Sequence, residues 1–266
     1  MPRDLLATLF GRQKPIIGMA HFLAMPGTPR YDEKGGVEAI RAAILQDVVA
    51  LQEGGVDGML FCNEADTPYT TEVGAEVPAT MAALIASIRE QLRMPYGVDV
   101  MWDPCAALAL AQATGASFVR GLFTGSYAGD VGLVAGRAGE ILRYRRRIGA
   151  QGVKLFDLIP AEFAGPLDVR PIELRAKTAV FLGAADAICV SGPMTGMEYA
   201  DDLRRVGNLV PDTPIIANTG VTAETVRSKL AAADGAIVGT AFKLEANPWN
   251  PVDVRRVKQL VETARS

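Results

Sequence analysis

Apolar and polar positions alternate along the chain in a way that predicts a repeated strand and helix unit. Short runs rich in Val, Ile and Phe are each followed by a longer segment with helical periodicity. This alternation is typical of parallel βα units, and the apolar runs predict eight strands, at 15–20, 56–62, 95–102, 117–123, 152–157, 186–191, 214–218 and 235–239. Helices are expected at 36–53, 77–92, 105–114, 132–147, 171–182, 197–207, 222–231 and 251–264.

Several units share a local pattern that favours a closed (β/α)8 TIM barrel over an open sheet. A helix ends in small residues and Gly, and a polar residue then opens the strand, as in EGGVDGML, LGAADAICV and AAADGAIVG. This weak internal repeat has the spacing of one βα unit. Asp57, Asp186 and Asp234 precede their strands, so we expect them at the N-terminal, stabilising end of the barrel.

Length and composition fit one barrel domain that spans residues 1–266. With 49% hydrophobic residues the chain can bury a large core, and a net charge of −3 attracts neither nucleic acid nor an anionic membrane. The RYRRR run at 143–147 suits the C-terminal end of a helix. No stretch is long enough to span a bilayer, and the N-terminus lacks the features of a signal peptide. Three cysteines without paired spacing fit a reducing compartment, so a cytoplasmic location is expected.

The firmest functional prediction is a phosphate site at residues 213–243, in the last two βα turns. Gly220, and Gly239 with Thr240, let backbone N–H groups approach an anion where barrel enzymes commonly hold phosphate. The alternative is that these glycines only permit tight turns. The loop after the sixth strand either extends the site or is a simple turn. The predicted phosphate-binding residues in these loops are Ser191, Gly192, Thr195, Gly196, Asn218, Thr219, Gly220, Gly239 and Thr240.

Candidate catalytic groups follow the strands, because active sites of such barrels lie at the C-terminal ends of the strands. His21 is the only histidine and closes the first strand, where it would act as general acid or base; the alternative is a packing role. Asp66, Asp103 and Asp157 are the candidate carboxyl partners. No cofactor is predicted, and a divalent metal is the less favoured alternative, because only these three carboxylates could supply its oxygen ligands.

Two further charged residues lie within predicted strands. Burial would lower the pKa of Lys154 and suit imine formation or proton transfer, unless the amine pairs with Asp157 or Asp103. Alternation along GVKLFD places Lys154 and Asp157 on opposite faces, so only one of them is expected to face the site. Arg120 would be costly to bury unless it met a carboxylate or an anionic ligand, so we assign it to substrate binding.

From about residue 15 to 262 the sequence resembles the BtpA/SgcQ family. The resemblance rests on GMAHFLAMPGTPR, LQEGGVDGMLFCNEADTPY, VRGLFTGSYAGDVGLV, RYRRRIGAQGVKL, ADAICVSGPMTG and the ending from NTGVTAETVRSKL onward. It implies a barrel of the ribulose-phosphate-binding type. The cyanobacterial member of the family is associated with photosystem I biogenesis, and other members are described as sugar or nucleoside enzymes.

The resemblance also bears on single residues at the predicted mouth of the barrel. His21 matches the histidine of the family's first-strand motif, and Asp103 matches an Asp after the third strand. An Asn-x-x-Asp-x-Pro loop is matched by Asn63, Asp66 and Pro68, and we expect Asn63 to bind substrate. The sequence departs from the pattern at Cys62, where Glu is expected, at Asp99, where Asn is expected, and at GVKLFD, where a Lys-His pair is common.

Two functions are consistent with these residues. The first is an enzyme on a small phosphorylated substrate, a sugar phosphate or a nucleoside-derived one, that catalyses isomerisation, aldol cleavage or glycosidic-bond hydrolysis. The second is a non-catalytic assembly factor, as the photosystem association of the relatives suggests. The number of ionisable groups at one face favours the enzyme. No nucleic acid partner is expected, and whether the chain forms a homo-oligomer is left open.

Overall fold

Eight parallel strands close into a barrel in the computed structural model, which describes residues 4–192 and 199–266. The predicted fold is therefore confirmed, with one strand in each apolar run. The strands are β1 (Ile16–His21), β2 (Gly58–Cys62), β3 (Tyr96–Asp99), β4 (Phe118–Gly121), β7 (Lys154–Ile159), β9 (Ala187–Ser191), β10 (Ile215–Asn218) and β11 (Gly235–Val238). Neighbours around the barrel follow chain order, and β11 pairs with β1 to close it.

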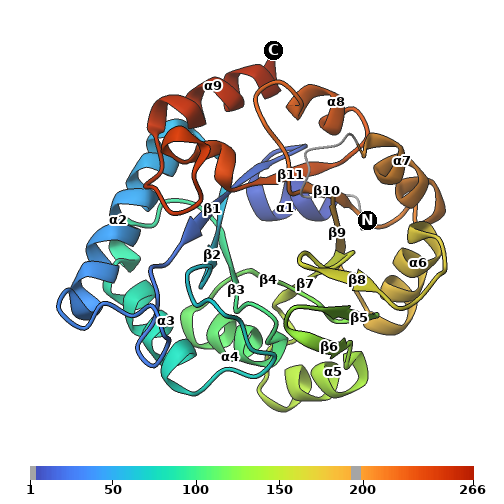
Figure 1. The fold of residues 1–266 in the computed structure, drawn as a ribbon. Helices are drawn as coiled ribbons and strands as arrows, with labels where there is room; N and C mark the ends of the chain where they lie inside the picture. Colours follow the sequence, from blue (N-terminus) through green and yellow to red (C-terminus); the bar gives the residue numbers. More distant parts are fainter. Residues whose placement is uncertain (1–3, 193–198) are drawn as a thin grey trace.

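Helices surround the barrel as an outer ring (Figure 1). They are α2 (Gly36–Gly54), α3 (Glu76–Ser87), α4 (Pro104–Thr114), α5 (Ala138–Arg147), α6 (Ile172–Gly183), α7 (Ala200–Leu209), α8 (Val226–Leu230) and α9 (Val254–Arg265). α5 ends in Arg145, Arg146 and Arg147, so the basic run lies at the helix C-terminus that was expected for it. None of the helices within the described ranges has the length and apolar character that crossing a membrane requires.

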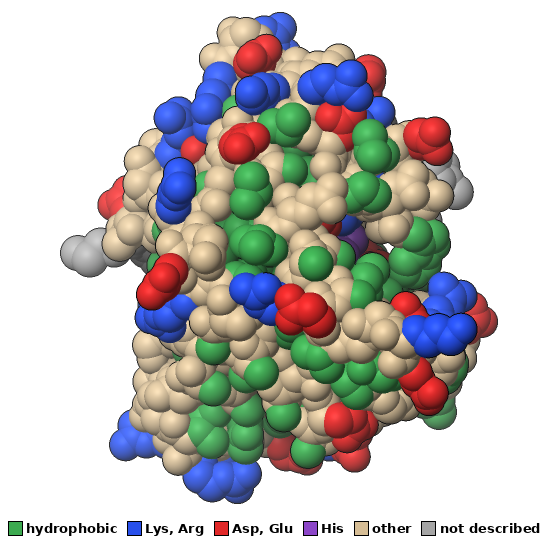
Figure 2. Space-filling view, turned by 90° about the vertical axis from the view of Figure 1, so that its left-hand side faces the viewer, with side chains coloured by type: hydrophobic (Ala, Val, Ile, Leu, Met, Phe, Trp, Pro, Cys, Tyr) green, Lys and Arg blue, Asp and Glu red, His purple; other side chains and the backbone are tan. Residues whose placement is uncertain are grey.

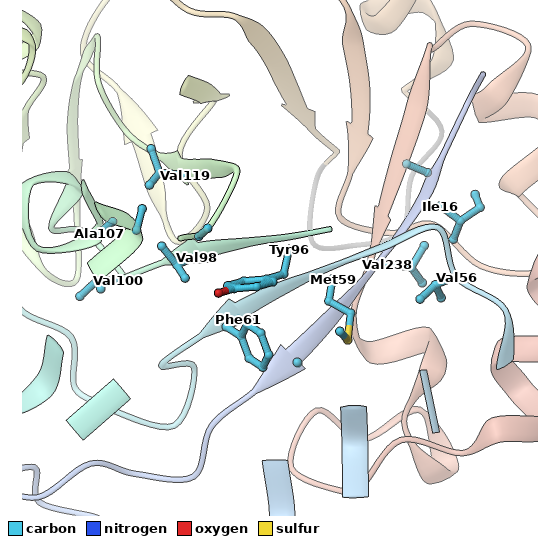
Figure 3. Close-up of a cluster of buried hydrophobic side chains, with 14 of the residues drawn as sticks. Ile16, Val56, Met59, Phe61, Tyr96, Val98, Val100, Ala107, Val119 and Val238 are labelled. Carbon is cyan, nitrogen blue, oxygen red and sulfur yellow. The ribbon is translucent and has the colours of Figure 1, made fainter. Parts of the chain in front are cut away.

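Alternation along each strand separates two apolar layers. Residues such as Ile17, Leu60 and Phe156 fill the inside of the barrel. Their neighbours in sequence point outward and pack under the helices, as Met59, Phe61 and other residues of this outer layer do in Figure 3. The last inward-facing residue of a strand is therefore the one whose side chain enters the mouth of the barrel.

The N-terminal end of the barrel is closed by α1 (Leu5–Phe10), which was not predicted. The ring of Phe10 packs edge-on against Phe118, with 5.7 Å between ring centroids, and a Cβ at Gly58 would overlap the Phe10 ring. Both Phe118 and Gly58 open their strands. Because α1 fills this end, a ligand has access to the barrel interior only from the opposite one.

Three aspartates brace the N-terminal end, as their position before a strand predicts. Each carboxylate accepts a hydrogen bond from a backbone N–H of the preceding barrel strand: Asp57 from Ile16 at 2.9 Å, Asp186 from Leu155 at 2.9 Å and Asp234 from Ile215 at 3.0 Å. The same contact thus recurs in three βα units. It fixes the relative position of neighbouring strands and leaves the opposite end of the barrel for chemistry.

A small antiparallel sheet lies beside the barrel and corrects one prediction. The helix expected over 132–147 begins only at Ala138, because 126–135 form the hairpin β5 (Ser126–Gly129) and β6 (Gly132–Ala135), which pairs with β8 (Ala164–Pro166). Gly132 adopts a φ of 89° at the hairpin turn, which a helix cannot accommodate. This sheet carries Asp130 and Val131 to the mouth of the barrel.

Candidate functional site

A cavity of about 830 Å³ opens at the C-terminal ends of the strands. Its walls come from the ends of β1, β4, β10 and β11 and from the loops that follow β2, β7, β10 and β11. Ionisable side chains in these walls include His21, Glu64, Arg120 and Glu162. Figure 2 shows the single histidine, in purple, recessed in a hollow of the surface. The size and the charged lining make this cavity the candidate functional site.

Arg120 lies at the floor of the cavity. The sequence predicts that this buried cation meets a carboxylate or an anionic ligand, and it meets a carboxylate. Its Nε donates to Asp99 Oδ2 at 2.8 Å, and its Nη1 donates to Asn218 Oδ1 at 2.9 Å. Burial alone would lower the pKa of Arg120, but the nearby carboxylates of Asp99 and Glu162 outweigh it and raise the pKa. The guanidinium therefore stays charged and held in one orientation.

Asn218 links Arg120 to Glu162, a residue of the loop after β7. Its Nδ2 donates to Glu162 Oε1 at 3.0 Å and to Ser191 Oγ at 2.9 Å. The hydroxyls of Ser191, at 3.4 Å, and of Thr219 also donate to Glu162 Oε1. Three of the residues predicted to bind substrate therefore meet at one carboxylate that the sequence prediction had omitted.

His21 faces Glu64, which lies in the loop after the neighbouring strand β2, with 3.9 Å between His21 Nε2 and Glu64 Oε2. Burial lowers the pKa of His21 to about 3, and the positive charges of Lys243 and Arg120 add to the effect. Burial also raises the pKa of Glu64, as does the nearby charge of Glu162. At neutral pH His21 is therefore an uncharged hydrogen-bonding group, and Glu64 holds its proton more tightly than an exposed glutamate does.

Glycine-containing loops after β10 and β11 form the wall of the cavity beside His21. Gly220 has a φ of 68°, and a Cβ built there would meet no atom within 4 Å, so its backbone borders open space. Gly239 packs closely, since its Cβ would lie 3.5 Å from His21 Cε1. Among the described residues, no acceptor takes a hydrogen bond from the backbone N–H of Gly220 or Thr240. Both donors are therefore available to a ligand at this wall.

The loop after β2 uses its polar residues to brace the backbone. Asn63 Nδ2 donates to Asp66 Oδ2 at 2.8 Å, and Asn63 Oδ1 accepts from the Met101 N–H at 2.8 Å. Asp66 Oδ1 accepts from the Met25 N–H at 2.7 Å. All of these atoms are buried, and neither Asn63 nor Asp66 lines the cavity. The structure thus places both residues beneath the mouth, where they hold three loops together.

Asp103 also has a local role. One of its carboxylate oxygens accepts from the Ala106 N–H at 3.0 Å and caps α4, and the other accepts from the Val73 N–H at 3.1 Å. It does not line the cavity. Both oxygens are therefore committed to the backbone.

Lys154 and Asp157 both lie on β7, and neither reaches the mouth. Lys154 opens the strand at the N-terminal end of the barrel, where its Nζ is 3.3 Å from Asp186 Oδ1. Its proton-transfer role is therefore not supported, because the whole strand separates it from the cavity. Asp157 points outward, as the alternation indicates, and accepts from the Phe123 N–H at 3.1 Å and from the Thr124 hydroxyl at 2.8 Å.

The loop after β9 is only partly described. Ser191 belongs to the Glu162 cluster, and Gly192 approaches the Tyr199 ring so closely that a Cβ would lie 2.2 Å from it. Thr195 and Gly196, two predicted phosphate-binding residues, lie outside the described residues. Within the described ranges, no three His, Cys, Asp or Glu side chains come together in a way that would hold a metal ion.

The sequence prediction did not assign Asp99, the partner of Arg120, or Glu162, which lines the cavity, to the site, although strand parity contains a signal for Asp99. Asp99 ends β3 on the inward face, two residues after Gly97, and Arg120 lies on the inward face of β4, two residues after Phe118. Extending the inward-facing positions of β3 to the end of the strand would have selected Asp99. Glu162 lies three residues beyond its strand, where no periodicity applies.

The comparison with curated proteins found relatives over nearly the whole chain. The sgc region protein SgcQ of Escherichia coli (strain K12) is 43% identical over 259 residues, which is 97% of this chain and 96% of that protein. The photosystem I biogenesis protein BtpA of Synechocystis sp. is 32% identical and matches 97% of this chain and 90% of its own.

Solved structures share the barrel at low sequence identity. A structure described as native KDPGal has a TM-score of 0.57 at 13% identity and covers 94% of both chains. Phosphoribosyl anthranilate isomerase from Thermus thermophilus has a TM-score of 0.56 at 13% identity, with 94% of this chain and 98% of that chain covered. These likenesses concern the fold alone. The model of the BtpA family matches residues 12–266, so the chain belongs to the BtpA family.

Proposed function

We propose that this protein is an enzyme that acts on a small phosphorylated substrate by proton transfer. The single observation that supports it most strongly is the lining of the mouth cavity. A fixed guanidinium, Arg120, and two carboxyl groups, Glu64 and Glu162, face the same space as the glycine loops of Gly220 and Thr240. Grouping these charges in a barrel mouth is expensive unless a ligand uses them.

The proposed roles follow from the surroundings of each group in the cavity. Glu64, whose pKa is raised by burial, would donate a proton, and Glu162 would accept one. Arg120 would stabilise negative charge that develops on the substrate. His21, neutral at pH 7, would orient the substrate through a hydrogen bond. These assignments replace Asp66, Asp103 and Asp157 as acid partners, since the hydrogen bonds of those aspartates point elsewhere.

Imine chemistry has no amine in this cavity. Lys154 lies at the other end of the barrel, and no lysine lines the cavity in the part of the chain that the structure describes. The buried Lys243 contacts Asp47 at 2.5 Å instead. This arrangement favours isomerisation or glycosidic-bond hydrolysis over aldol cleavage through an imine.

Phosphate binding is tested by thermal unfolding with inorganic phosphate and a panel of sugar phosphates and nucleotides at millimolar concentration. We expect the wild type to be stabilised and Thr240→Asp to lose the effect, since a carboxylate at this exposed rim would repel the anion. Ser228→Asp, exposed on α8 and outside the cavity lining, adds the same charge and should keep the effect. No stabilisation of the wild type by any compound would refute the phosphate site.

Catalysis is tested on any compound of the panel that is turned over. Glu64→Gln should lower kcat by about 10²- to 10⁴-fold, the usual range for loss of a general acid. Glu72→Gln is the matched control, because this glutamate of the same loop is 73% exposed and pairs with Arg137 outside the cavity. Equal rates for wild type and Glu64→Gln would remove Glu64 from the mechanism.

A second candidate function is assembly without turnover. It is favoured by the 32% identity to a relative that carries the name of a photosystem I biogenesis protein. In that case small phosphates would neither stabilise the chain nor be converted, and Arg120 and Glu162 would serve only the stability of the mouth. The thermal unfolding series therefore separates the two candidates before any reaction is known.

A further inference from the structure

Three aromatic side chains surround the mouth cavity, and the proton-transfer proposal does not use them. They are Tyr69 in the loop after β2, Phe163 in the loop after β7 and Trp249 in the loop after β11. Phe163 is 40% exposed and Trp249 is 51% exposed. Large apolar rings left open to solvent at a cavity are typical of binding surfaces.

Tyr69 and Phe163 meet across the opening of the barrel. Their strands, β2 and β7, are separated by β3 and β4, yet the ring centroids lie 6.1 Å apart. Tyr69 is held in place because its hydroxyl donates to the backbone oxygen of Glu64 at 2.9 Å. Phe163 adopts a φ of 60°, a strained conformation for a bulky residue. Strain of this kind concentrates at ligand contacts.

Trp249 forms another part of the rim. The guanidinium of Arg30 lies 5.5 Å from its ring centroid and restrains the ring by a cation–π contact. Next to it Pro248 lines the cavity, and deeper inside lie Met19 and Ile237. This apolar part of the wall suits a ring better than the hydroxyl groups of a plain sugar.

The cavity is also larger than a phosphate requires. Its 830 Å³ is near the upper end of ordinary ligand pockets, so much of the space remains after an anion occupies the Gly220 and Thr240 wall. We infer that the substrate carries a planar aromatic ring as well as its phosphate, with the ring bound among Tyr69, Phe163 and Trp249. This inference rests on the proposed function, and it selects the nucleotide class over simple sugar phosphates.

The test compares uridine and adenosine monophosphate with ribose 5-phosphate, unphosphorylated nucleosides and inorganic phosphate, by calorimetry and tryptophan fluorescence. The chain has two tryptophans, and Trp102 is buried, so a ring stacked on the rim should quench the Trp249 emission. A nucleoside monophosphate should bind about tenfold or more tightly than ribose 5-phosphate, the lower range for base stacking. The fluorescence change should vanish in Trp249→Phe.

Variants separate the ring from the phosphate. Phe163→Leu and Trp249→Leu should each weaken nucleotide binding about tenfold and leave phosphate binding unchanged. Phe181→Leu is the control, because this phenylalanine is 83% exposed on α6 and does not line the cavity.

The outcomes distinguish the two proposals. If ribose 5-phosphate and the nucleotides bind with equal affinity, and Phe163→Leu binds nucleotides as tightly as the wild type, the proposed aromatic ring of the substrate is refuted. The phosphate site would be unaffected by this result. If nucleosides bind as tightly as their monophosphates, the result would support the aromatic ring and refute the phosphate site. Absence of binding by all of the compounds would refute both.

Discussion

Replacing Asp157 with Asn should make the protein more stable above neutral pH and flatten its pH dependence. The carboxyl group is fully buried between the barrel wall and the end of α6, where a Cβ at Gly183 would lie 3.6 Å from its Oδ2. Burial raises the pKa of Asp157 from 3.8 to about 7, although hydrogen bonds from Phe123 and Thr124 oppose the rise. The folded chain therefore keeps a proton that the unfolded chain releases.

The sign and size of the effect follow from this difference. The contribution of Asp157 to stability is fully present below pH 3.8 and is lost as the pH rises through about 7. The shift corresponds to ~4 kcal/mol, an upper value if the site admits no water. Asn has the same shape, its Oδ1 can accept from the Phe123 N–H, and the Thr124 hydroxyl can turn to accept from its Nδ2.

Urea unfolding over a pH series from about 4 to 8 measures this difference. Wild type should lose up to ~4 kcal/mol relative to Asp157→Asn as the pH rises. Asp168→Asn is the control, because the hydrogen bond from Arg170 lowers the pKa of this exposed carboxyl to about 2, so its pH dependence has the opposite sign. Parallel curves for wild type and Asp157→Asn would refute the reasoning. Any turnover should survive Asp157→Asn, since the side chain faces away from the cavity.

Three further predictions concern ion pairs of different burial. Lys243→Met should lower the free energy of unfolding by ~3–5 kcal/mol in urea unfolding, because it leaves Asp47 buried without its ammonium group. Arg120→Met should cost a similar amount at pH 7, and the loss should shrink toward acid pH as Asp99, whose pKa is raised by burial, takes up a proton. A deficit that did not change with pH would argue against the Asp99 pairing. Lys154→Ala should change stability by less than ~1 kcal/mol and leave any turnover unchanged, since its pair with Asp186 is partly exposed and distant from the cavity.

The barrel could be predicted from the sequence because its signal is repeated. Eight apolar runs alternate with helices and support one another, two of these helices end in a Gly C-cap at Gly55 and Gly115, and Asp57, Asp186 and Asp234 mark the same structural position in three units. The hairpin over 126–135 breaks the repeat. Its pairing with β8 joins residues more than thirty positions apart, a contact that no local pattern encodes.

The candidate site was predicted only in part, because proximity to a strand end does not decide where a side chain points. Asn218, Ser191 and Arg120 do converge, because each lies on the inward face of a strand at or next to its C-terminal end, and Thr219 follows Asn218 directly. Asn63, Asp66 and Asp103 lie just as close to strand ends in sequence. Their polar atoms turn to backbone N–H groups of neighbouring loops, a choice set by tertiary structure.

Glu64 and Asp157 show that a raised pKa alone does not identify a catalytic group. The side chain must also face the cavity. Burial raises the pKa of both Glu64 and Asp157. Glu64 faces His21 and the cavity, whereas Asp157 faces α6 and is satisfied by Phe123 and Thr124. Burial raises the pKa of an acid on either face of the barrel wall, but only a side chain that faces the cavity can contact a substrate. An acid of this barrel is therefore a catalytic candidate when its pKa is raised and its side chain lines the cavity, and of these two acids only Glu64 meets both conditions.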